Sequence, residues 1–228
     1  MSSCQQCIAR QFNALNKLSK NELKHLSDSK TEVSFKKGEV LFSEGANLNG
    51  IFCVKTGNCK MSKLSSNGKD QIVRFVKGGE LLGYRSVISE ESAGLTVTAM
   101  DNMKVCFIAK ENIFDMVKAN QNFSLDIFKM VCNDLKEANI LLTDMAQKSV
   151  RERLAHTLLY LKDIFGLDTD GNINVLLSRE EIANVIGTAT ESAIRLLSEF
   201  KKEKIILLKG KKIKILDEKS LKKIDLGF

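Results

Sequence analysis

The sequence predicts an α+β fold: an N-terminal β-roll (a double-stranded jelly roll), one long dimerisation helix and a C-terminal winged helix-turn-helix. Three observations predict it. Short apolar runs punctuated by glycine fill residues 33–108, a heptad seam fills residues 124–147, and two short helices joined at Gly187 precede a basic hairpin. Many short strands are typical of β-sandwiches and barrels, and a heptad period is typical of a coiled coil. We expect the divisions at residues 1–122, 123–147 and 148–228.

Composition and charge narrow the classes of function. The 228 residues are 43% hydrophobic, which suffices for real cores. No apolar run approaches a membrane span and the first 20 residues lack the apolar block of a secretion signal, so we expect a cytoplasmic protein with no membrane partner. Six scattered cysteines do not form a secreted disulfide framework, and we expect them largely reduced. The net charge of +7 favours polyanionic partners without deciding between them.

The N-terminal segment predicts a short helix followed by the strands of the roll. In "SKNELKHLSD", Ser19 and Glu22 have the spacing of a capping box. From Val33 to Ile108, glycines stand where strands must turn, and several of them are expected at positive φ, which glycine tolerates. These glycines are Gly38, Gly45, Gly50, Gly57, Gly68, Gly78, Gly79 and Gly83.

The long helix carries one apolar seam with alternating steps of three and four residues. A stripe this narrow, on a helix about 36 Å long, predicts a coiled-coil partner and therefore a homodimer. The alternative is a core helix packed on its own β-domain, because a second apolar face is present, and both can hold at once. The seam consists of Phe128, Val131, Leu135, Ala138, Leu142 and Met145, and the second face of Leu125, Ile127, Cys132, Ile140 and Leu141.

The C-terminal part predicts helices around a tight turn, with a strand before them and a hairpin after them. An amphipathic helix starts near Ser149 and ends at Gly166, and Asp170-Gly171 then marks a reverse turn with a short strand. After the two short helices, two β-runs flank "KGKK" at residues 209–212, which predicts a basic wing.

The two short helices are the most specified part of the chain. Ser178 with Glu181, and Thr188 with Glu191, have capping-box spacing on either side of Gly187. Their apolar faces are expected to pack across the turn, which predicts a helix-turn-helix. These faces consist of Ile182, Val185 and Ile186 on the first helix, and Ala193, Leu196, Leu197 and Phe200 on the second.

The second of these helices has side chains suited to base edges. Glu191 can accept from cytosine N4, Arg195 can bond guanine bidentately, and Ser192 can reach a base or a phosphate. Because a two-fold dimer places two such helices about 34 Å apart, the expected partner is double-stranded DNA with a palindromic operator. Each residue also has a structural alternative: Glu191 caps its own helix, Arg195 pairs with Glu199, and the lysines at 201, 202 and 204 form a solvated face. Further predicted DNA contacts are Thr190, Thr188, Arg179 and Lys211.

The order of parts resembles the CRP/FNR family of bacterial transcription regulators over nearly the whole chain, and is closer to the FNR-like branch than to cyclic-AMP-binding members. "KKGEVLFSEG…NGIFCVKTGNCK" resembles the family's β-roll opening, "GGELLG" its central segment, and "SREEIANVIGTATESAIRLLSEF" its helix-turn-helix. The resemblance implies a roll like the cyclic-nucleotide-binding domain, sequence-specific DNA binding, and RNA polymerase as a further partner. The family's base-contacting Glu and Arg match Glu191 and Arg195. Thr190 and Ile194 replace neighbouring family residues, so we expect a half-site different from that of either branch.

A cyclic nucleotide is the first effector that the resemblance suggests. In family members that bind a cyclic nucleotide, a Glu holds the ribose and an Arg the phosphate, and the resemblance places Tyr84 and Ala93 at these positions. A buried phosphate without its cation would cost several kcal/mol, so we expect no cyclic nucleotide.

An iron-sulfur cluster is the second effector that the resemblance suggests. Cys4, Cys7 and Cys106 match three of the four ligand positions in the oxygen-sensing branch, and Asn13 stands at the remaining one. Three thiolates do not complete a four-cysteine cage, so we expect no cluster unless Cys53, Cys59 or an exogenous ligand fills the gap.

The cysteines also have readings that need no cluster. Cys53, Cys59, Cys106 and Cys132 are alternatively small buried hydrophobes. Cys4 and Cys7 are expected to be exposed near a flexible end, and redox or metal chemistry there is a hypothesis. Otherwise the roll binds another effector or serves mainly as a dimer scaffold.

Nothing in the sequence indicates an enzyme. His25 and His156 lie far apart on predicted helices, and no metal-spaced His/Glu set, phosphate-cradling glycine loop or nucleophile elbow occurs. We therefore expect a homodimeric DNA-binding regulator with an unidentified effector. The alternative is a ligand-binding or protein-interaction module with the same roll, whose C-terminal hairpin docks a protein and which does not bind DNA specifically.

Overall fold

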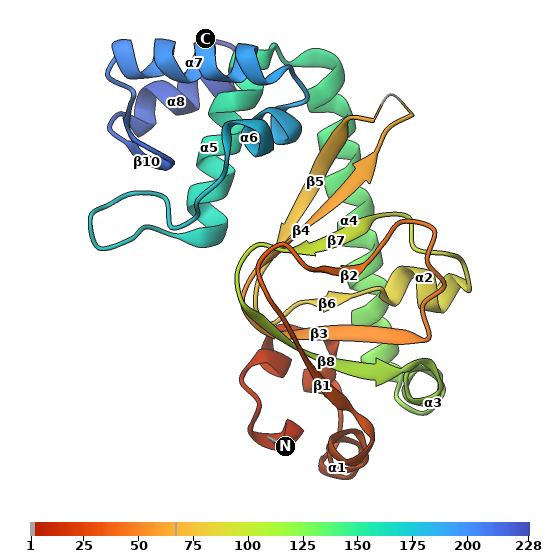
Figure 1. Cartoon of the computed structure of the whole chain (residues 1–228). Helices are drawn as coiled ribbons and strands as arrows, with labels where there is room; N and C mark the ends of the chain where they lie inside the picture. The colour runs from red at the N-terminus through yellow and green to blue at the C-terminus, as the bar shows by residue number, and fades with distance from the viewer. Residues whose placement is uncertain (1–2, 67) are drawn as a thin grey trace. The chain divides into compact units, whose positions relative to one another are not determined.

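The computed structural model describes residues 3–66 and 68–228 (Figure 1). Its contacts divide the chain into two compact units. One comprises the chain up to Lys63 with Val73–Glu137, and the other Leu64–Ile72 with Ala138–Phe228. The long helix is shared between them, so the predicted divisions after residues 122 and 147 stay a proposal about functional segments.

The first unit contains an antiparallel β-roll. Its strands form two four-stranded sheets, ordered β1-β8-β3-β6 and β2-β7-β4-β5. The core between the sheets includes Val54, Cys59, Val97 and Val105, each with no exposed surface. The predicted β-roll is therefore confirmed. The strands are β1 (Thr31–Phe35), β2 (Val40–Phe42), β3 (Gly50–Thr56), β4 (Cys59–Leu64), β5 (Asp70–Val76), β6 (Leu81–Leu82), β7 (Thr96–Ala99) and β8 (Met103–Ala109).

One predicted glycine turn shows why the residue is required. Gly57 joins β3 to β4 at φ +88°, and a Cβ there would lie 2.5 Å from the Cβ of Met103. Any other residue would meet both backbone strain and a steric clash at this position. The same left-handed region is occupied by Gly38, Gly45, Gly68, Gly79 and Gly83.

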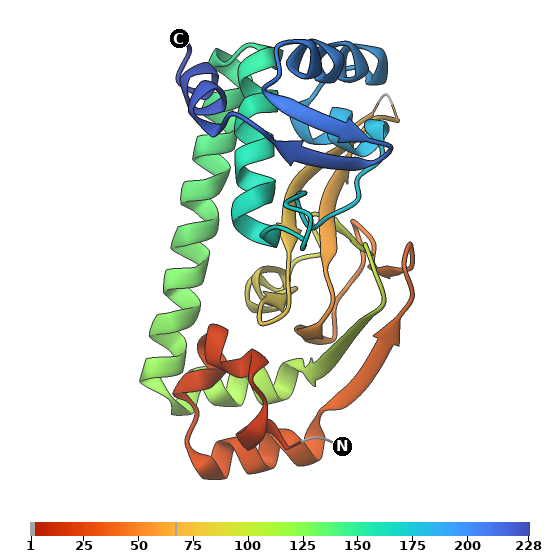
Figure 2. The ribbon, with the colours of Figure 1, turned by 90° about the vertical axis from the view of Figure 1, so that its left-hand side faces the viewer.

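Helices cover the other face of the β1-β8-β3-β6 sheet. The predicted helix after Ser19 is confirmed: the Ser19 hydroxyl accepts from the Glu22 amide, and the Glu22 carboxylate accepts from the Ser19 amide. Figure 2 shows this helix beside the start of the long helix, where Asn120 donates to the Glu22 carboxylate at 3.1 Å. The helices of this unit are η1 (Cys4–Gln6), η2 (Ala9–Phe12), η3 (Ala14–Lys17), α1 (Lys20–Ser29), α2 (Tyr84–Ser89), α3 (Lys110–Ala119) and the first part of α4 (Gln121–Gln147).

Helix α4 has one inward and one outward side. Phe123 and Ile127 are buried against the roll. Phe128, Leu135 and Leu142 are instead 66%, 62% and 70% exposed, although all three are large apolar residues. A single chain thus leaves the centre of the predicted seam uncovered.

The remaining apolar residues of α4 divide between the two sides. Val131 is partly buried against the roll core, and Met145 is also partly buried. The predicted second face does not form a continuous inward surface, because Leu125, Cys132 and Ile140 are exposed. Of that face, only Ile127 is fully buried.

The second unit contains a helix-turn-helix and a two-stranded wing. The predicted amphipathic helix is confirmed and ends at Gly166. The predicted strand after it is wrong: residues 167–177 form a loop whose one described bridge joins Leu167 and Ile173. No helix among the described residues is long and apolar enough to cross a membrane. The elements are α5 (Val150–Phe165), α6 (Arg179–Ile186), α7 (Thr190–Lys202), β9 (Ile206–Lys209), β10 (Lys212–Ile215) and α8 (Glu218–Asp225).

Candidate nucleic-acid interface

Helix α6 and its turn are fixed by hydrogen bonds. The Ser178 hydroxyl accepts from the Glu181 amide at 3.0 Å, and the Glu181 carboxylate accepts from the Ser178 amide at 2.9 Å. Gly187 then ends the helix at φ 66° and ψ 53°, and its N–H donates to the Ala183 carbonyl. The first predicted capping box is confirmed, and the left-handed turn requires glycine.

The second predicted capping box is wrong. Helix α7 begins at Thr190, its N-cap is Ala189, and that position makes no side-chain capping bond. The Thr188 amide instead donates to the Ala183 carbonyl at 3.1 Å, so Thr188 completes the end of α6. The capping alternative for Glu191 therefore falls as well, and Glu191 lies exposed in the first turn of α7.

Helix α7 presents a polar face opposite its buried one. Arg195 has a side chain that is 73% exposed, and Ile194 is 45% exposed. The Arg195 guanidinium lies 3.9 Å from the Glu199 carboxylate, a long ion pair at the surface. Such pairs contribute at most about 1 kcal/mol, so Arg195 can exchange it for a base edge. The buried face consists of Ala193, Leu196, Leu197 and Phe200, as predicted.

Two arginines of α5 hold this motif, and the sequence patterns did not reveal them. Arg153 donates from Nε to the Ile186 carbonyl at 2.7 Å, which satisfies the C-terminal end of α6 beside the turn. Arg151 lies 4.7 Å above the Phe200 ring and pairs with Glu203 at 2.6 Å. Their roles depend on contacts between helices far apart in sequence, which periodicity does not report.

The predicted wing is confirmed as the hairpin β9–β10. Its turn exposes Lys211 at the tip, and Arg179 donates to the Gly210 carbonyl at 2.8 Å. Lys212, part of the predicted basic turn, instead pairs with Asp168 at 3.2 Å and with Asp170 at 3.6 Å. Hydrogen bonds from Asn172 and Lys212 hold the pKa of Asp168 well below its usual value. The wing is thus fixed to the loop that replaced the predicted strand.

The predicted DNA contacts fall into two groups by exposure. Glu191, Arg195 and Lys211 are exposed. Arg179 is partly buried and already bonded to the wing, so a DNA contact by it would have to compete with that bond. The partly buried predicted contacts also include Thr188, Thr190 and Ser192.

The roll has neither a carboxylate at position 84 nor a cation at position 93, the two groups that the resemblance requires for a cyclic nucleotide. Tyr84 donates its hydroxyl to Asp134 of α4, and Arg74 pairs with the same carboxylate at 2.7 Å and also with Glu80. Burial, together with the Asp134 carboxylate, raises the pKa of Tyr84. Ala93 is only 2% exposed. Arg74, the cation beside Tyr84, is therefore already paired with two carboxylates, whereas the Arg85 guanidinium lies beside Gly94, next to Ala93.

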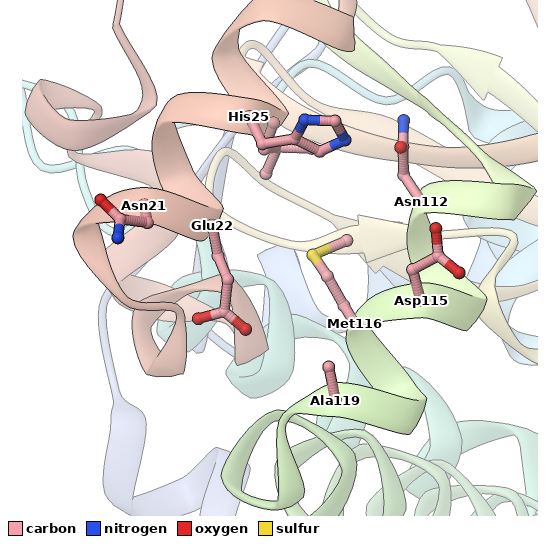
Figure 3. Close-up of a pocket in the computed structure, with 8 residues that line it drawn as sticks. Asn21, Glu22, His25, Asn112, Asp115, Met116 and Ala119 are labelled. Atoms are coloured by element: carbon pink, nitrogen blue, oxygen red, sulfur yellow. The ribbon is translucent and has the colours of Figure 1, made fainter.

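The described part of the first unit also has a groove of about 270 Å³ between α1 and α3. Figure 3 shows His25 and Asn112 facing it from opposite sides, with Met116 between them. Glu22 and Asp115 also line it, so the groove is acidic at its margins and unsuited to a phosphate.

The exposure of two cysteines differs from the prediction. Cys4 is buried rather than exposed, at 7%, because η1 packs on the roll core, whereas Cys132 is exposed rather than buried. Cys7 is partly exposed, and the other three cysteines are buried as predicted. Burial raises the pKa of both Cys53 and Cys59 to about 12.

The cysteines are not arranged as a set of four metal ligands among the described residues, although Cys53 lies near Cys4, Cys7 and Cys106. Asn13 is buried at the fourth ligand position, where its amide donates to the Gly79 carbonyl at 2.8 Å. Lys30 hydrogen-bonds with Cys4, which places an ammonium group among the thiols. Among the described residues, no three His, Cys, Asp or Glu side chains are arranged to hold a metal ion.

Comparison with known proteins places this architecture in a family. The model of the cyclic nucleotide-binding domain matches residues 32–120, and the model of the Crp-like helix-turn-helix domain matches residues 152–224. The chain belongs to the CRP/FNR family of transcription regulators. It is a DNA-binding regulator of the CRP/FNR type and not an enzyme. Regulators of this family bind DNA and form dimers.

Individual relatives and structures agree with this placement. The fumarate and nitrate reduction regulatory protein of Vibrio cholerae is 26% identical over 96% of this chain and 88% of its own. The transcriptional activator protein Anr of Pseudomonas protegens is 28% identical over 80% of this chain and 75% of its own. FixK2 of Bradyrhizobium japonicum has the same fold, with a TM-score of 0.77 and 24% identity over 86% of this chain and 97% of that one.

Proposed function

We propose that this CRP/FNR regulator acts as a homodimer and reads a palindromic operator with helix α7. The observation that carries the proposal is the exposure of Glu191 and Arg195 on the face of α7 opposite its buried residues. A guanidinium can bond guanine O6 and N7 bidentately, and a carboxylate can accept from cytosine N4. The spacing of four residues puts both groups on one face of the helix, so they can read neighbouring base pairs.

The remaining predicted DNA contacts would position helix α7 and the wing on the duplex. Thr190 and Ser192 lie in the first turn of α7, where short side chains let the helix enter the major groove. Thr188 lies in the turn and Arg179 is the first residue of α6, and we assign both to phosphates. Lys211, exposed at the tip of the wing, is assigned to the backbone of the flanking duplex.

Dimerisation is assigned to α4. Phe128, Leu135 and Leu142 repeat every seven residues and are all more than 60% exposed. Three large apolar side chains in one row of a long helix are costly in water and match the seam of a coiled coil. Ala138 is exposed beside them, and Val131 and Met145 complete the seam from its partly buried side.

Regulation is assigned to the β-roll. Its effector shifts the dimer between DNA-competent and incompetent states by changing the relative angle of the two α7 helices through α4. Tyr84 and Arg74 both bond Asp134, so a change at the roll reaches α4 directly. RNA polymerase is the further partner, and the site of action is the cytoplasm, where the chromosome lies.

Binding to random-sequence duplex DNA at rising salt tests this function. A dimer that neutralises several phosphates should lose affinity on the order of 1000-fold between about 50 mM and about 200 mM salt. Lys211→Ala should lower the slope of log K against log salt by about one per protomer, because it removes one phosphate contact. Lys104→Ala removes the same charge from an exposed site on β8 and should leave the slope unchanged.

Absence of detectable DNA binding at low salt would contradict the proposal. It would favour the second candidate, a protein-interaction module that uses the same helical hairpin.

A further inference from the structure

The N-terminal segment holds two cysteines one helical turn apart. Cys4 begins η1, and the Cys7 amide donates to the Cys4 carbonyl at 3.3 Å. Such a turn brings the two Cα atoms within about 7 Å, and disulfides join Cα atoms that are about 4.4 to 6.8 Å apart. The Cys4 amide is itself fixed by the Ser27 hydroxyl at 2.8 Å. The spacing of this turn is within the reach of a disulfide between the two residues.

A buried lysine lies against this pair. Lys30 is only 3% exposed. Burial opposes its charge, but the hydrogen bond with Cys4 and the neighbouring thiols of Cys106 and Cys7 outweigh this and raise the pKa of Lys30. The ammonium group thus stays charged and faces sulfur. The Lys30 ammonium can therefore donate to a sulfur that carries negative charge during an exchange reaction.

The two thiols differ in access. Cys7 is partly exposed and can meet a small molecule, whereas Cys4 is buried beside Lys30. An accessible thiol beside a protected one is the arrangement of an attacking and a resolving cysteine.

We propose that Cys4 and Cys7, held beside Lys30, form a dithiol that reacts with low-molecular-weight disulfides. The proposal concerns the sensor segment alone and does not depend on the assignment of DNA contacts to α7.

The reaction proceeds in two exchanges. The Cys7 thiolate attacks one sulfur of the external disulfide, so a Cys7 mixed disulfide forms and one small thiolate leaves and takes up a proton. The Cys4 thiolate then attacks the Cys7 sulfur, the Cys4–Cys7 bond forms as the mixed disulfide breaks, and the second small thiolate leaves and takes up a proton. In sum, two protein thiols and one small disulfide give one protein disulfide and two small thiols, and Lys30 keeps its proton throughout.

The other buried thiols are poor competitors. Cys53 and Cys106 are direct partners on strands β3 and β8 beneath the segment. Burial raises the pKa of both thiols, so they stay protonated and unreactive near neutral pH. Cys132 is exposed on α4 and serves as an internal reference for an exposed thiol outside this segment.

The test is oxidation of the intact reduced protein by oxidised glutathione, followed by trypsin digestion and mass spectrometry. Cys4 and Cys7 fall in one tryptic peptide, residues 1–10, and Cys132 falls in another, residues 130–136. We expect the first peptide to lose two hydrogens without keeping glutathione, and the second to keep one glutathione. Cys4→Ser should stop the first peptide at the glutathione adduct, and Cys7→Ser should leave it unmodified.

The role of Lys30 is tested by rate. Lys30→Met should slow release of the second glutathione about tenfold, because a charge-assisted hydrogen bond is lost, whereas Lys30→Arg should largely restore it. If thermal unfolding shows that Lys30→Met is not folded, the Cys4→Ser and Cys7→Ser results still decide the dithiol. A wild-type peptide that stays reduced, or that keeps glutathione as Cys132 does, would overturn the proposal.

Discussion

Leu135→Lys is expected to convert the dimer into a monomer and to weaken operator binding by about 100- to 10,000-fold. Leu135 is 62% exposed at the centre of the predicted seam, where the same residue of a second chain would face it. Two lysines there would bury like charges without partners. In a dimer, binding of one half-site raises the effective concentration of the second DNA-binding unit at the other half-site. A monomer loses this gain, which is about 100- to 10,000-fold in affinity. Sedimentation velocity measures the first effect, and operator titration measures the second.

The neighbouring residue supplies a matched control. Lys136 is exposed and lies one position along the helix, away from the seam, so Lys136→Glu should remain dimeric although it also changes charge. A cysteine at position 135, in a Cys132→Ser background, should cross-link two chains on mild oxidation. If Leu135→Lys remains dimeric and the cross-link fails, α4 is not the dimer interface.

Arg195→Ala is expected to relax specificity at one base pair of each half-site. The loss of a bidentate contact to guanine should cost about 1 to 3 kcal/mol, or about 5- to 150-fold, for the preferred sequence. The cost should be much smaller for sequences already changed at that base pair. Binding of the wild type and the variant to a panel of operators with single base changes measures this difference.

Lys202→Ala is the control for Arg195→Ala. Lys202 is exposed near the end of the same helix, and its replacement removes one charge without removing a base contact. We expect Lys202→Ala to weaken all operators by a similar factor. If Arg195→Ala also weakens all operators equally, Arg195 contacts phosphate or supports the structure, and its assignment to guanine is wrong.

The features predicted correctly from the sequence are those encoded within one helix or turn. Ser19 with Glu22, and Ser178 with Glu181, form their boxes because each pair satisfies amides of its own first turn. Gly187 ends α6 because only a residue without Cβ adopts its left-handed conformation readily. These interactions need no knowledge of the rest of the fold.

The features predicted wrongly depend on neighbours that sequence spacing does not identify. Thr188 has capping-box spacing, but its amide completes the end of α6 instead. The end of α6 and the start of α7 are separated by only residues 187–189, so one residue cannot serve both helices. Cys4 lies near the chain end, where exposure is the usual expectation, yet the roll core covers it. The hydrogen bond from Tyr84 to Asp134 joins residues 50 apart in the sequence, so it could be identified only in the folded structure.

The candidate site follows the same division. The exposure of Glu191 and Arg195 could be predicted because their spacing on one helix defines a face, and both side chains are exposed; their contacts with bases stay a prediction. Arg153, which fixes the turn from α5, could not be predicted, because its contact with Ile186 joins residues 33 apart in the sequence. Spacing along one helix therefore predicts which residues face outward, whereas contacts between helices, such as that of Arg153, are found only in the folded structure.

Selection of bound sequences from a pool of random duplex DNA tests the central claim most directly. A dimer that reads bases with α7 should enrich a two-fold symmetric sequence, with half-sites centred about one helical turn apart. Each half-site should contain a G·C pair whose enrichment disappears when the selection is repeated with Arg195→Ala. Recovery of sequences with no common symmetric site, from protein that is folded and dimeric, would contradict sequence-specific recognition by α7.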